Sequence, residues 1–227
     1  MYNVIFDMDG VIFDSERTQL VCWLETAEKY GLDERLVRDT YIKCTGTNDR
    51  QTREIYKNAL LPLLGEEMLW HIWDESFDLY RKRYPDGLFP VKPGVREILE
   101  YLKSRGVGVG IASSTKRQII EKRIDAAGLS GFFLGCIGGD AVKISKPDPG
   151  IYRLACESFG FVPGDTFAIE DSFNGIRAAY AAGMRPIMVP DMVPADEEMQ
   201  RLSEIVCNDL IEVMNYLNRR SGNGGCR

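Results

Sequence analysis

The chain has 227 residues, of which 44% are hydrophobic and 27% charged, as in an ordinary globular protein. Its formal net charge of −6 argues against nucleic acid or an anionic membrane as the main partner, and no apolar run approaches membrane-spanning length. The beginning of the chain shows no basic region or cleavage pattern of a secretory signal. We therefore expect a cytoplasmic monomer with no nucleic-acid and no membrane partner.

The first predicted element is a buried strand formed by the apolar run Val4 to Phe6. Asp7 follows at its carboxyl end, where open α/β sheets place their ligands, and the turn through Gly10 brings Asp9 back towards the same crevice. Two carboxylates this close repel each other unless a cation or a proton lies between them. The pair indicates a divalent metal, a proton-transfer role or both, and a solvated acidic turn is the alternative.

Four helices are predicted to follow this strand. The apolar residues of 16–30 recur with helical spacing, and similar patterns cover about 33–43, 49–61 and 66–84. Because no strand is predicted between 15 and 84, this segment is expected to form a small helical bundle. Turn residues at 85–90 then predict a linker.

From residue 93 onward, predicted helices and strands alternate. The helices are expected at 93–104, 116–127, 148–159, 174–182 and 209–218, and the strands at 107–112, 133–137, 166–169, 186–189 and 204–207. Such alternation is typical of an α/β fold with a mostly parallel sheet covered on both faces. We predict a core of residues 1–14 and 85–220, an inserted α-helical bundle cap domain of 15–84 that acts as a lid, and a disordered tail at 221–227.

The cysteines and the histidine narrow the chemistry. The six cysteines include no C-x-x-C pair, so we expect reduced and mostly buried thiols. His71 is the only histidine, which removes a His-rich zinc site and makes a Ser-His-Asp triad hard to build. Packing or surface exposure is the favoured role for His71.

Three further polar groups stand at predicted strand ends or helix starts. Ser113 and Ser114 precede a helix, where hydroxyls and free N–H groups bind anions, although simple helix capping is the alternative. Lys146 lies in a proline-restricted loop as a candidate point charge for phosphate, and Glu170 and Asp171 end a buried strand. Hard oxygen ligands favour Mg²⁺ over zinc. Together with Asp7 and Asp9, these residues are typical of phosphoryl transfer.

These motifs resemble those of the haloacid dehalogenase superfamily, in the subgroup of β-phosphoglucomutase-like and phosphoglycolate-phosphatase-like enzymes. The resemblance spans essentially the whole chain and rests on four segments in order, which are 7–16, 112–114, 145–149 and 169–175. It implies a Rossmann-like core with a helical cap inserted after the first strand.

The resemblance also implies a role for each matching residue. Asp7 resembles the nucleophile that becomes an aspartyl phosphate, and Asp9 the general acid and base. Ser113 and Lys146 match the groups that bind the phosphoryl oxygens, next to Ser114. The implied ligands of Mg²⁺ are Asp7, the main-chain carbonyl of Asp9, Asp171 and Glu170, the last directly or through water.

Departures from the family separate the possible reactions. Asp9 argues against dehalogenation, and the absence of lysine from 16–28 argues against phosphonate hydrolysis. Where β-phosphoglucomutase carries a cap histidine this chain has Gln19, and Asp49 stands at the position of a phosphate-binding arginine, with Arg50 one place later. These departures favour a phosphatase over a mutase. A catalytically silent binding or regulatory protein is the alternative of another class, although it would be expected to lack Asp7, Asp9 or Lys146.

The substrate is expected to be a small phosphorylated metabolite such as a sugar phosphate, because a helical cap closes over the site. The candidate substrate-binding residues of the cap are Arg17, Thr47, Asn48 and Arg50. Their alternative roles are a solvated helix charge and a group of helix-capping residues.

Overall fold

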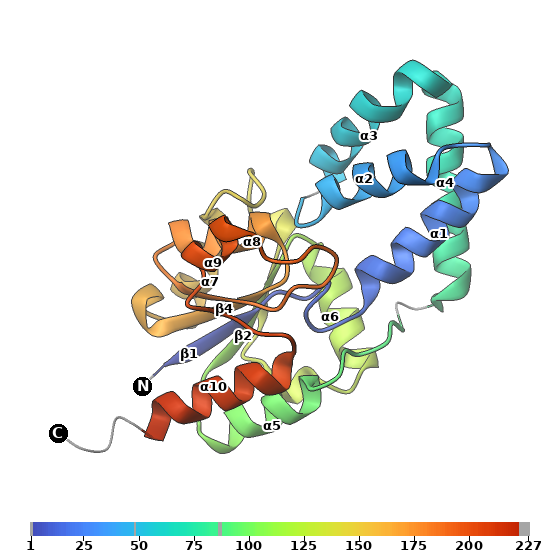
Figure 1. Cartoon of the computed structure of the whole chain (residues 1–227). Coiled ribbons are helices and arrows are strands. Elements are labelled where there is room, and N and C mark those ends of the chain that lie inside the picture. Colours follow the sequence, from blue (N-terminus) through green and yellow to red (C-terminus); the bar gives the residue numbers. More distant parts are fainter. Residues whose placement is uncertain (1, 48, 86–87, 223–227) are drawn as a thin grey trace.

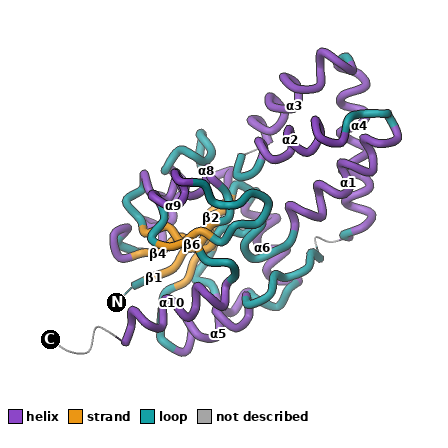
Figure 2. The backbone as a smooth tube through the Cα atoms, viewed as in Figure 1, coloured by secondary structure: helices purple, strands orange, loops and turns teal. Residues whose placement is uncertain are grey.

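A six-stranded parallel sheet forms the centre of the protein, seen in a computed structural model that describes residues 2–47, 49–85 and 88–222. The strand order is β3-β2-β1-β4-β5-β6, with β1 in the middle of the sheet. The strands are β1 (Asn3–Phe6), β2 (Val109–Ser113), β3 (Cys136–Gly138), β4 (Thr166–Glu170), β5 (Arg185–Met188) and β6 (Ile205–Val206). Each predicted strand is present, so the α/β fold with a parallel sheet is confirmed (Figure 2).

Helices cover both faces of the sheet because its strands are apolar on both sides. Val4 and Phe6 of β1 belong to one buried cluster, together with residues of α5 (Val95–Ser104), α6 (Arg117–Ala126) and α10 (Leu210–Gly222). Ile5 points the other way and packs in a second cluster with residues of α7 (Gly150–Phe159) and α8 (Phe173–Ala181). The alternation of side chains along β1 thus joins two helical layers to one strand.

One of the α-helices in the described part of the chain was not expected from the sequence. Helix α9 (Glu197–Leu202) is only six residues long, and Asp196 caps it by accepting a hydrogen bond from the Met199 N–H. Met199 is its buried residue. A single buried side chain gives no periodic pattern, so this helix could not be recognised by apolar spacing.

The cap, which we define as helices α1–α4, extends away from the sheet (Figure 1). It consists of α1 (Ser15–Lys29), α2 (Glu34–Cys44), α3 (Asp49–Leu64) and α4 (Glu66–Arg83). Their inward residues form an aromatic-rich cluster of their own, which includes Trp23, Tyr41, Tyr56 and Trp73. The four predicted helices are therefore present and pack as a bundle, while the division into two domains at 15 and 84 remains a prediction.

The two segments that connect the cap to the core, one leaving the core and one returning to it, lie side by side. The Asp14 N–H donates to the carbonyl oxygen of Pro90 at 2.9 Å, and Phe13 pairs with Val91 in an antiparallel bridge. The outgoing and returning segments are thus hydrogen-bonded to each other at the base of the cap. This arrangement leaves α1 to begin directly behind the Asp7 and Asp9 turn.

The remaining predictions concern single residues and the end of the chain. The five described cysteines are unpaired, and four of them are buried. His71 is exposed and contacts the Tyr30 ring edge-on. Helix α10 continues to Gly222, while the rest of the predicted disordered tail, Cys226 included, lies outside the described residues.

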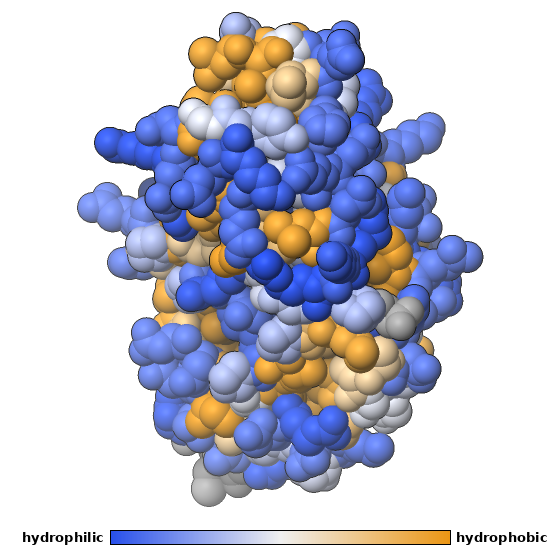
Figure 3. All heavy atoms as spheres, turned by 90° about the vertical axis from the view of Figure 1, so that its right-hand side faces the viewer, coloured by the Kyte–Doolittle hydropathy of each residue, from blue (hydrophilic) through white to orange (hydrophobic). Residues whose placement is uncertain are grey.

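No helix in the part of the chain that the structure describes could span a membrane. None of its helices combines the length and the apolar character needed to cross a bilayer. Apolar surface does gather at the tip of the cap, where Leu63 and Met68 are exposed at the connection of α3 and α4 (Figure 3).

Candidate active site

The candidate site lies where the carboxyl ends of β1, β2 and β4 meet. Phe6 pairs with Ile111 of β2 and with Ile169 of β4, so Asp7 follows directly between the ends of these two neighbours. Ser113 ends β2 and Glu170 ends β4. The parallel register therefore brings Asp7 close to side chains that follow it by more than a hundred residues in the sequence.

Lys146 links two of these carboxylates in the interior. Its ammonium lies 2.6 Å from Asp7 Oδ1 and 2.5 Å from Glu170 Oε1, and its side chain is 1% exposed. Burial acts against the charged ammonium, but the carboxylates of Asp7 and Glu170 outweigh it and raise the pKa of Lys146. Lys146 is therefore a fixed, permanently charged group beside Asp7.

Glu170 has partners at both of its carboxylate oxygens. Oε1 accepts from Lys146 and from the Tyr152 hydroxyl at 2.6 Å. Oε2 accepts from the N–H groups of Asp171 and Ser172 and from the Ser172 hydroxyl. A carboxylate engaged in this way would have to give up donors before it could bind a cation directly, so the geometry favours a supporting position for Glu170.

Asp171 differs from Glu170 because no described residue donates a hydrogen bond to its carboxylate. It is 6% exposed and lies against Gly10, where a Cβ atom would come within 2.2 Å of Asp171 Oδ2. Gly10 has φ +82°, a left-handed conformation that glycine adopts without strain. The turn after Asp9 therefore requires glycine both for its conformation and for the space that Asp171 occupies.

The three carboxylates form a group that fits a divalent cation. Ligand atoms of Asp7, Glu170 and Asp171 all lie within 4.8 Å of one another. Burial raises the pKa values of Asp7 and Asp171 well above the usual range, and the Glu170 carboxylate raises both further, while Lys146 lowers that of Asp7. A cation would offset this unfavourable concentration of negative charge. All-oxygen ligands are those that Mg²⁺ prefers.

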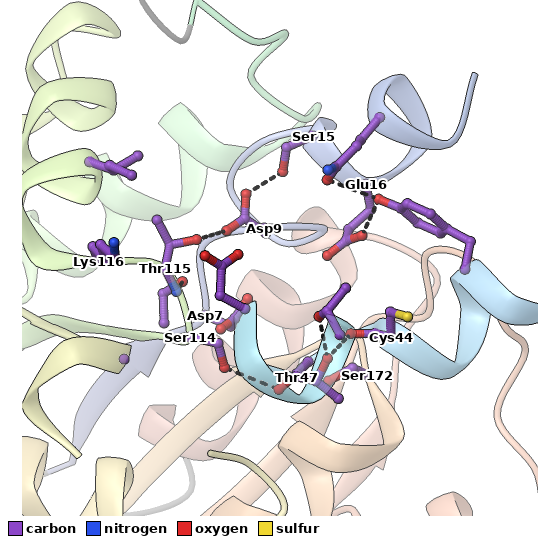
Figure 4. Close-up of a pocket in the computed structure, with 18 of the residues that line it drawn as sticks. Asp7, Asp9, Ser15, Glu16, Cys44, Thr47, Ser114, Thr115, Lys116 and Ser172 are labelled. Atoms are coloured by element: carbon purple, nitrogen blue, oxygen red, sulfur yellow. Dashed lines mark hydrogen bonds between the residues drawn. The ribbon is translucent and has the colours of Figure 1, made fainter. Parts of the chain in front are cut away.

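Asp9 is held by three donors on the opposite side of its turn. Ser15 Oγ donates to Oδ1, Thr115 Oγ1 donates to Oδ2 at 2.7 Å, and Arg123 Nη1 donates to Oδ1 at 2.8 Å. Figure 4 shows Asp7 and Asp9 lying between Thr115 of the core and Glu16 of α1. The two aspartates of one turn thus have different partners, a buried lysine for Asp7 and a hydroxyl-arginine set for Asp9.

The hydroxyl segment after β2 lies beside Asp7. Ser113 is 1% exposed, and its Oγ accepts from the Thr115 N–H at 3.2 Å. The Ser114 hydroxyl instead donates to the Gly46 carbonyl oxygen, which belongs to the cap. Lys116 follows as the residue before α6 and has no side-chain capping bond. Two predicted phosphate-binding hydroxyls are therefore adjacent to Asp7, and one of them also joins the core to the cap.

A cavity of about 480 Å³ lies between the core site and the cap. Asp7, Asp9, Ser113, Ser114 and Asp171 line it from the core, whereas Glu16, Gln19, Thr47 and Arg50 line it from the cap. Lys146 and Glu170 lie behind this lining. The predicted cap residue Asn48 is outside the described residues.

Arg17 does not line the cavity. It points to the loop after β5, where its guanidinium donates to the Asp191 side chain at 2.9 Å and to the Asp191 carbonyl oxygen at 2.8 Å. Lys92 also donates to Asp191, from the returning segment of the chain. This geometry favours a role for Arg17 in holding the base of the cap on the core.

Several residues of the site could not be identified from motifs. Thr115 follows Ser113 and Ser114 directly and donates to Asp9. Arg123 stands next to the buried Ile124 of α6, and Tyr152 lies in the buried stripe of α7. A charged group or a hydroxyl beside the buried face of a helix needs a hydrogen-bonding partner, and this requirement is the only sequence feature that indicates a role for Arg123 and Tyr152.

The chain is similar to proteins of one known family. The sequence model of the family described as haloacid dehalogenase-like hydrolase matches residues 4–189. The phosphorylated carbohydrates phosphatase of Thermotoga maritima is 34% identical over 188 residues, which are 82% of this chain and 84% of that protein. Hexitol phosphatase B of Escherichia coli is 29% identical over 219 residues, with 91% and 95% covered. A crystal structure of β-phosphoglucomutase from Clostridium difficile has a TM-score of 0.74 at 21% identity, covers 100% of both chains and supports the fold alone.

Proposed function

The chain belongs to the haloacid dehalogenase-like hydrolase family, and we propose that it is a Mg²⁺-dependent phosphatase of a small phosphorylated carbohydrate, with Asp7 as the nucleophile. The observation that carries this proposal is the position of Asp7, at a strand end beside the buried Lys146 and within 4.8 Å of the ligand atoms of Asp171. The names of the two phosphatase relatives support a phosphorylated carbohydrate as the class of substrate.

Lys146 prepares Asp7 for attack. It holds Oδ1, and no described residue donates to Oδ2, so that Oδ2 is available to the phosphorus atom. Attack by Oδ2 forms an aspartyl phosphate and breaks the ester bond between phosphorus and the leaving oxygen. The transferring phosphoryl oxygens would accept hydrogen bonds from Ser113 and from main-chain N–H groups before α6.

Asp9 has the position expected of a general acid and base. It would protonate the leaving oxygen during attack and then accept a proton from the water that hydrolyses the aspartyl phosphate, which releases phosphate and restores Asp7. Ser15, Thr115 and Arg123 would orient its carboxylate in both steps.

The cation would be held by Asp7, Asp171 and the main-chain carbonyl of Asp9, with Glu170 as a supporting carboxylate. Asp171 fits this role because it is nearly buried and receives no hydrogen bond from a described residue. When bound, Mg²⁺ would neutralise phosphoryl negative charge and would reduce the repulsion between the anionic substrate and Asp7.

A phosphosugar mutase is the competing reaction on the same scaffold. Gln19 lines the cavity where a mutase would have a histidine, and it accepts a hydrogen bond from Tyr41 at 3.2 Å. A neutral amide cannot transfer a proton as a histidine does. Gln19 therefore favours release of the phosphoryl group to water.

Phosphate release from a panel of phosphorylated sugars and polyols tests the proposed function, with Mg²⁺ and with excess EDTA. We expect metal-dependent release from at least one sugar or polyol monophosphate. Absence of release from every ester would contradict the phosphatase and favour a silent binding protein. Conversion of β-glucose 1-phosphate to glucose 6-phosphate, in the presence of a bisphosphate primer, would identify a mutase instead.

A further inference from the structure

The cap contributes one polar wall to the cavity that the proposed chemistry does not use. We call it the cap-end wall and define it as Glu16, Gln19, Tyr41 and Tyr56. All four residues line the cavity, and they come from α1, α2 and α3. The wall faces the space that the leaving group of a phosphate ester would occupy when its phosphorus lies at Asp7.

Tyr56 carries a buried hydroxyl without a partner. The residue is 1% exposed, and its hydroxyl makes no hydrogen bond in the described part of the chain. Leaving a buried hydroxyl unsatisfied is unfavourable, so the Tyr56 hydroxyl is available to a partner that enters the cavity, either a water molecule or a hydroxyl of the substrate. Tyr41 is different, because its hydroxyl interacts with both Glu16 Oε2 and Gln19 Oε1.

The two bonds of Tyr41 leave complementary atoms unengaged on Glu16 and Gln19. No described residue donates to Glu16 Oε1 or accepts from the Gln19 amide N–H groups. Figure 4 shows the Glu16 carboxylate directed towards the interior of the cavity. The cap-end wall thus offers an acceptor, a donor and the Tyr56 hydroxyl, which can be either. A carbohydrate hydroxyl both donates and accepts, and it matches this set.

Aromatic packing fixes the position of the Tyr56 hydroxyl. The Tyr56 ring stacks on Trp23 with 4.6 Å between ring centroids, and Trp73 packs edge-on to it at 5.1 Å. Trp23 and Trp73 also line the cavity. This buried aromatic packing holds the wall in one arrangement before a ligand binds, which lowers the entropic cost of binding.

The charges of the cavity exclude an anionic group from this wall. Among the described lining residues the cations are Arg50, Lys116 and Arg123. Arg123 is paired with Asp9, Lys116 precedes α6 of the core, and Arg50 lies about 9 Å along α3 from Tyr56. At pH 8, where Glu16 is ionised, a carboxylate or phosphate at the cap-end wall would instead meet the Glu16 carboxylate and be repelled.

We propose that the cap-end wall is a hydroxyl-binding subsite, which selects phosphate esters whose leaving group ends in an uncharged hydroxyl over those that end in an anion. This inference deepens the proposed function and rests on it. Tyr56 and Glu16 are the residues that determine this specificity.

The first measurement compares two esters of equal length. A hexitol 6-phosphate ends in a hydroxyl, and the corresponding hexonate 6-phosphate ends in a carboxylate. We expect kcat/KM for the hexitol ester to be at least about tenfold higher, as is usual when a buried site must accept an unpaired charge. Acetyl phosphate, which is too short to reach the cap-end wall, serves as the reference substrate.

Two conservative variants then locate the discrimination. Tyr56→Phe is expected to lower kcat/KM for the hexitol ester about fivefold, mainly through KM, and to lower kcat/KM for acetyl phosphate by a smaller factor. Glu16→Gln is expected to reduce the preference for hexitol over hexonate at least about threefold. Tyr30→Phe and Glu25→Gln are matched controls, because their side chains pair with Glu75 and Arg83 outside the cavity.

The outcome separates this inference from the proposed function. If the enzyme hydrolyses esters but kcat/KM is the same for the hexitol and the hexonate ester, the hydroxyl subsite is overturned and the phosphatase proposal stands. The same conclusion follows if Tyr56→Phe and Glu16→Gln both have the kinetics and the preference of the wild type. If no ester is hydrolysed, the phosphatase proposal fails. Calorimetric binding of the two esters to Asp7→Asn then still tests the subsite, which requires tighter binding of the hexitol ester.

Discussion

The Ser114 hydroxyl donates to the carbonyl oxygen of Gly46 at 3.0 Å, and this bond joins the core site to the cap. Asn174 strengthens the contact by donating to the Thr45 carbonyl oxygen at 3.2 Å. The cap segment around Gly46 therefore lies directly on the end of the sheet. Its main chain, rather than its side chains, makes these hydrogen bonds.

Gly46→Ala is predicted to impair cap closure. The residue has φ +75°, and a Cβ atom there would lie 2.8 Å from Ser172 Oγ. We expect kcat/KM to fall about tenfold or more, because closure loses on the order of 1–2 kcal/mol. Gly31→Ala is the matched control, since Gly31 has φ +68° but no atom within 4 Å of the added methyl group. Equal kinetic losses in both variants would contradict the closure argument.

Tyr152→Phe tests the support of Glu170. The change removes the hydroxyl that donates to Glu170 Oε1 at 2.6 Å and keeps the ring. A lost hydrogen bond to a buried charged group is expected to lower the free energy of unfolding by about 1.5–3 kcal/mol, measured by urea denaturation. Tyr30→Phe breaks a similar but only partly buried bond to Glu75, and it is expected to cost less than about 1 kcal/mol. A smaller loss in Tyr152→Phe than in Tyr30→Phe would reject this role.

Glu16 predicts a specific pH dependence of stability. Its pKa is raised from 4.5 to about 7, mainly by burial and also by the carboxylates of Asp9 and Asp191, while the Tyr41 hydroxyl and Arg123 oppose the rise. The folded protein therefore binds this proton more tightly than the unfolded chain does, and stability falls as pH rises from about 4.5 to 7.

Glu16→Gln removes the loss of stability that comes from ionising a buried carboxyl group, and it keeps an acceptor for the Tyr41 hydroxyl. The gain in Tm relative to wild type is expected to be larger at pH 8 than at pH 5, as measured by thermal unfolding. Glu25→Gln is the control, because Arg83 lowers the pKa of that surface carboxylate. A gain from Glu16→Gln that is the same at both pH values would rule out the raised pKa.

Mg²⁺ is predicted to stabilise the protein through Asp171. At about a hundred times Kd, a ligand adds roughly 2.7 kcal/mol, which corresponds to a Tm increase of about 5 °C or more in a chain of this size. The increase should be smaller at pH 5.5 than at pH 8, because Asp7 and Asp171 have raised pKa values and must lose protons to bind. Asp171→Asn should abolish it, and the exposed Asp165→Asn should not. A normal increase in Asp171→Asn would exclude this site.

The parts of the structure with strong local signals could be predicted from the sequence. The strand before Asp7 and the helices of the cap follow from apolar spacing, and they agree with the structure to within a few residues. The positions of Asp7, Ser113 and Glu170 follow from the rule that parallel strands end at one edge. Asp171 could be placed there as well because it follows Glu170 directly.

The partners of these residues depend on packing between distant segments, which no local pattern contains. The sequence does not indicate that both oxygens of Glu170 are engaged, or that Arg123 reaches Asp9 across 114 positions. Arg17 was expected near the substrate because it follows the first motif, but its direction on α1 takes it to Asp191. Helical phase sets that direction, and an error of one residue changes it by about 100°.

The central claim is that Asp7 attacks the substrate phosphorus. Its most direct test is acid quenching of the enzyme during turnover of a hexitol 6-phosphate with Mg²⁺, followed by mass spectrometry of the peptide that contains Asp7. We predict one phosphoryl group on this peptide in the wild type, none in Asp7→Asn, and a loss of about 10³-fold or more in the rate of that variant. Turnover by Asp7→Asn at the wild-type rate would contradict the account.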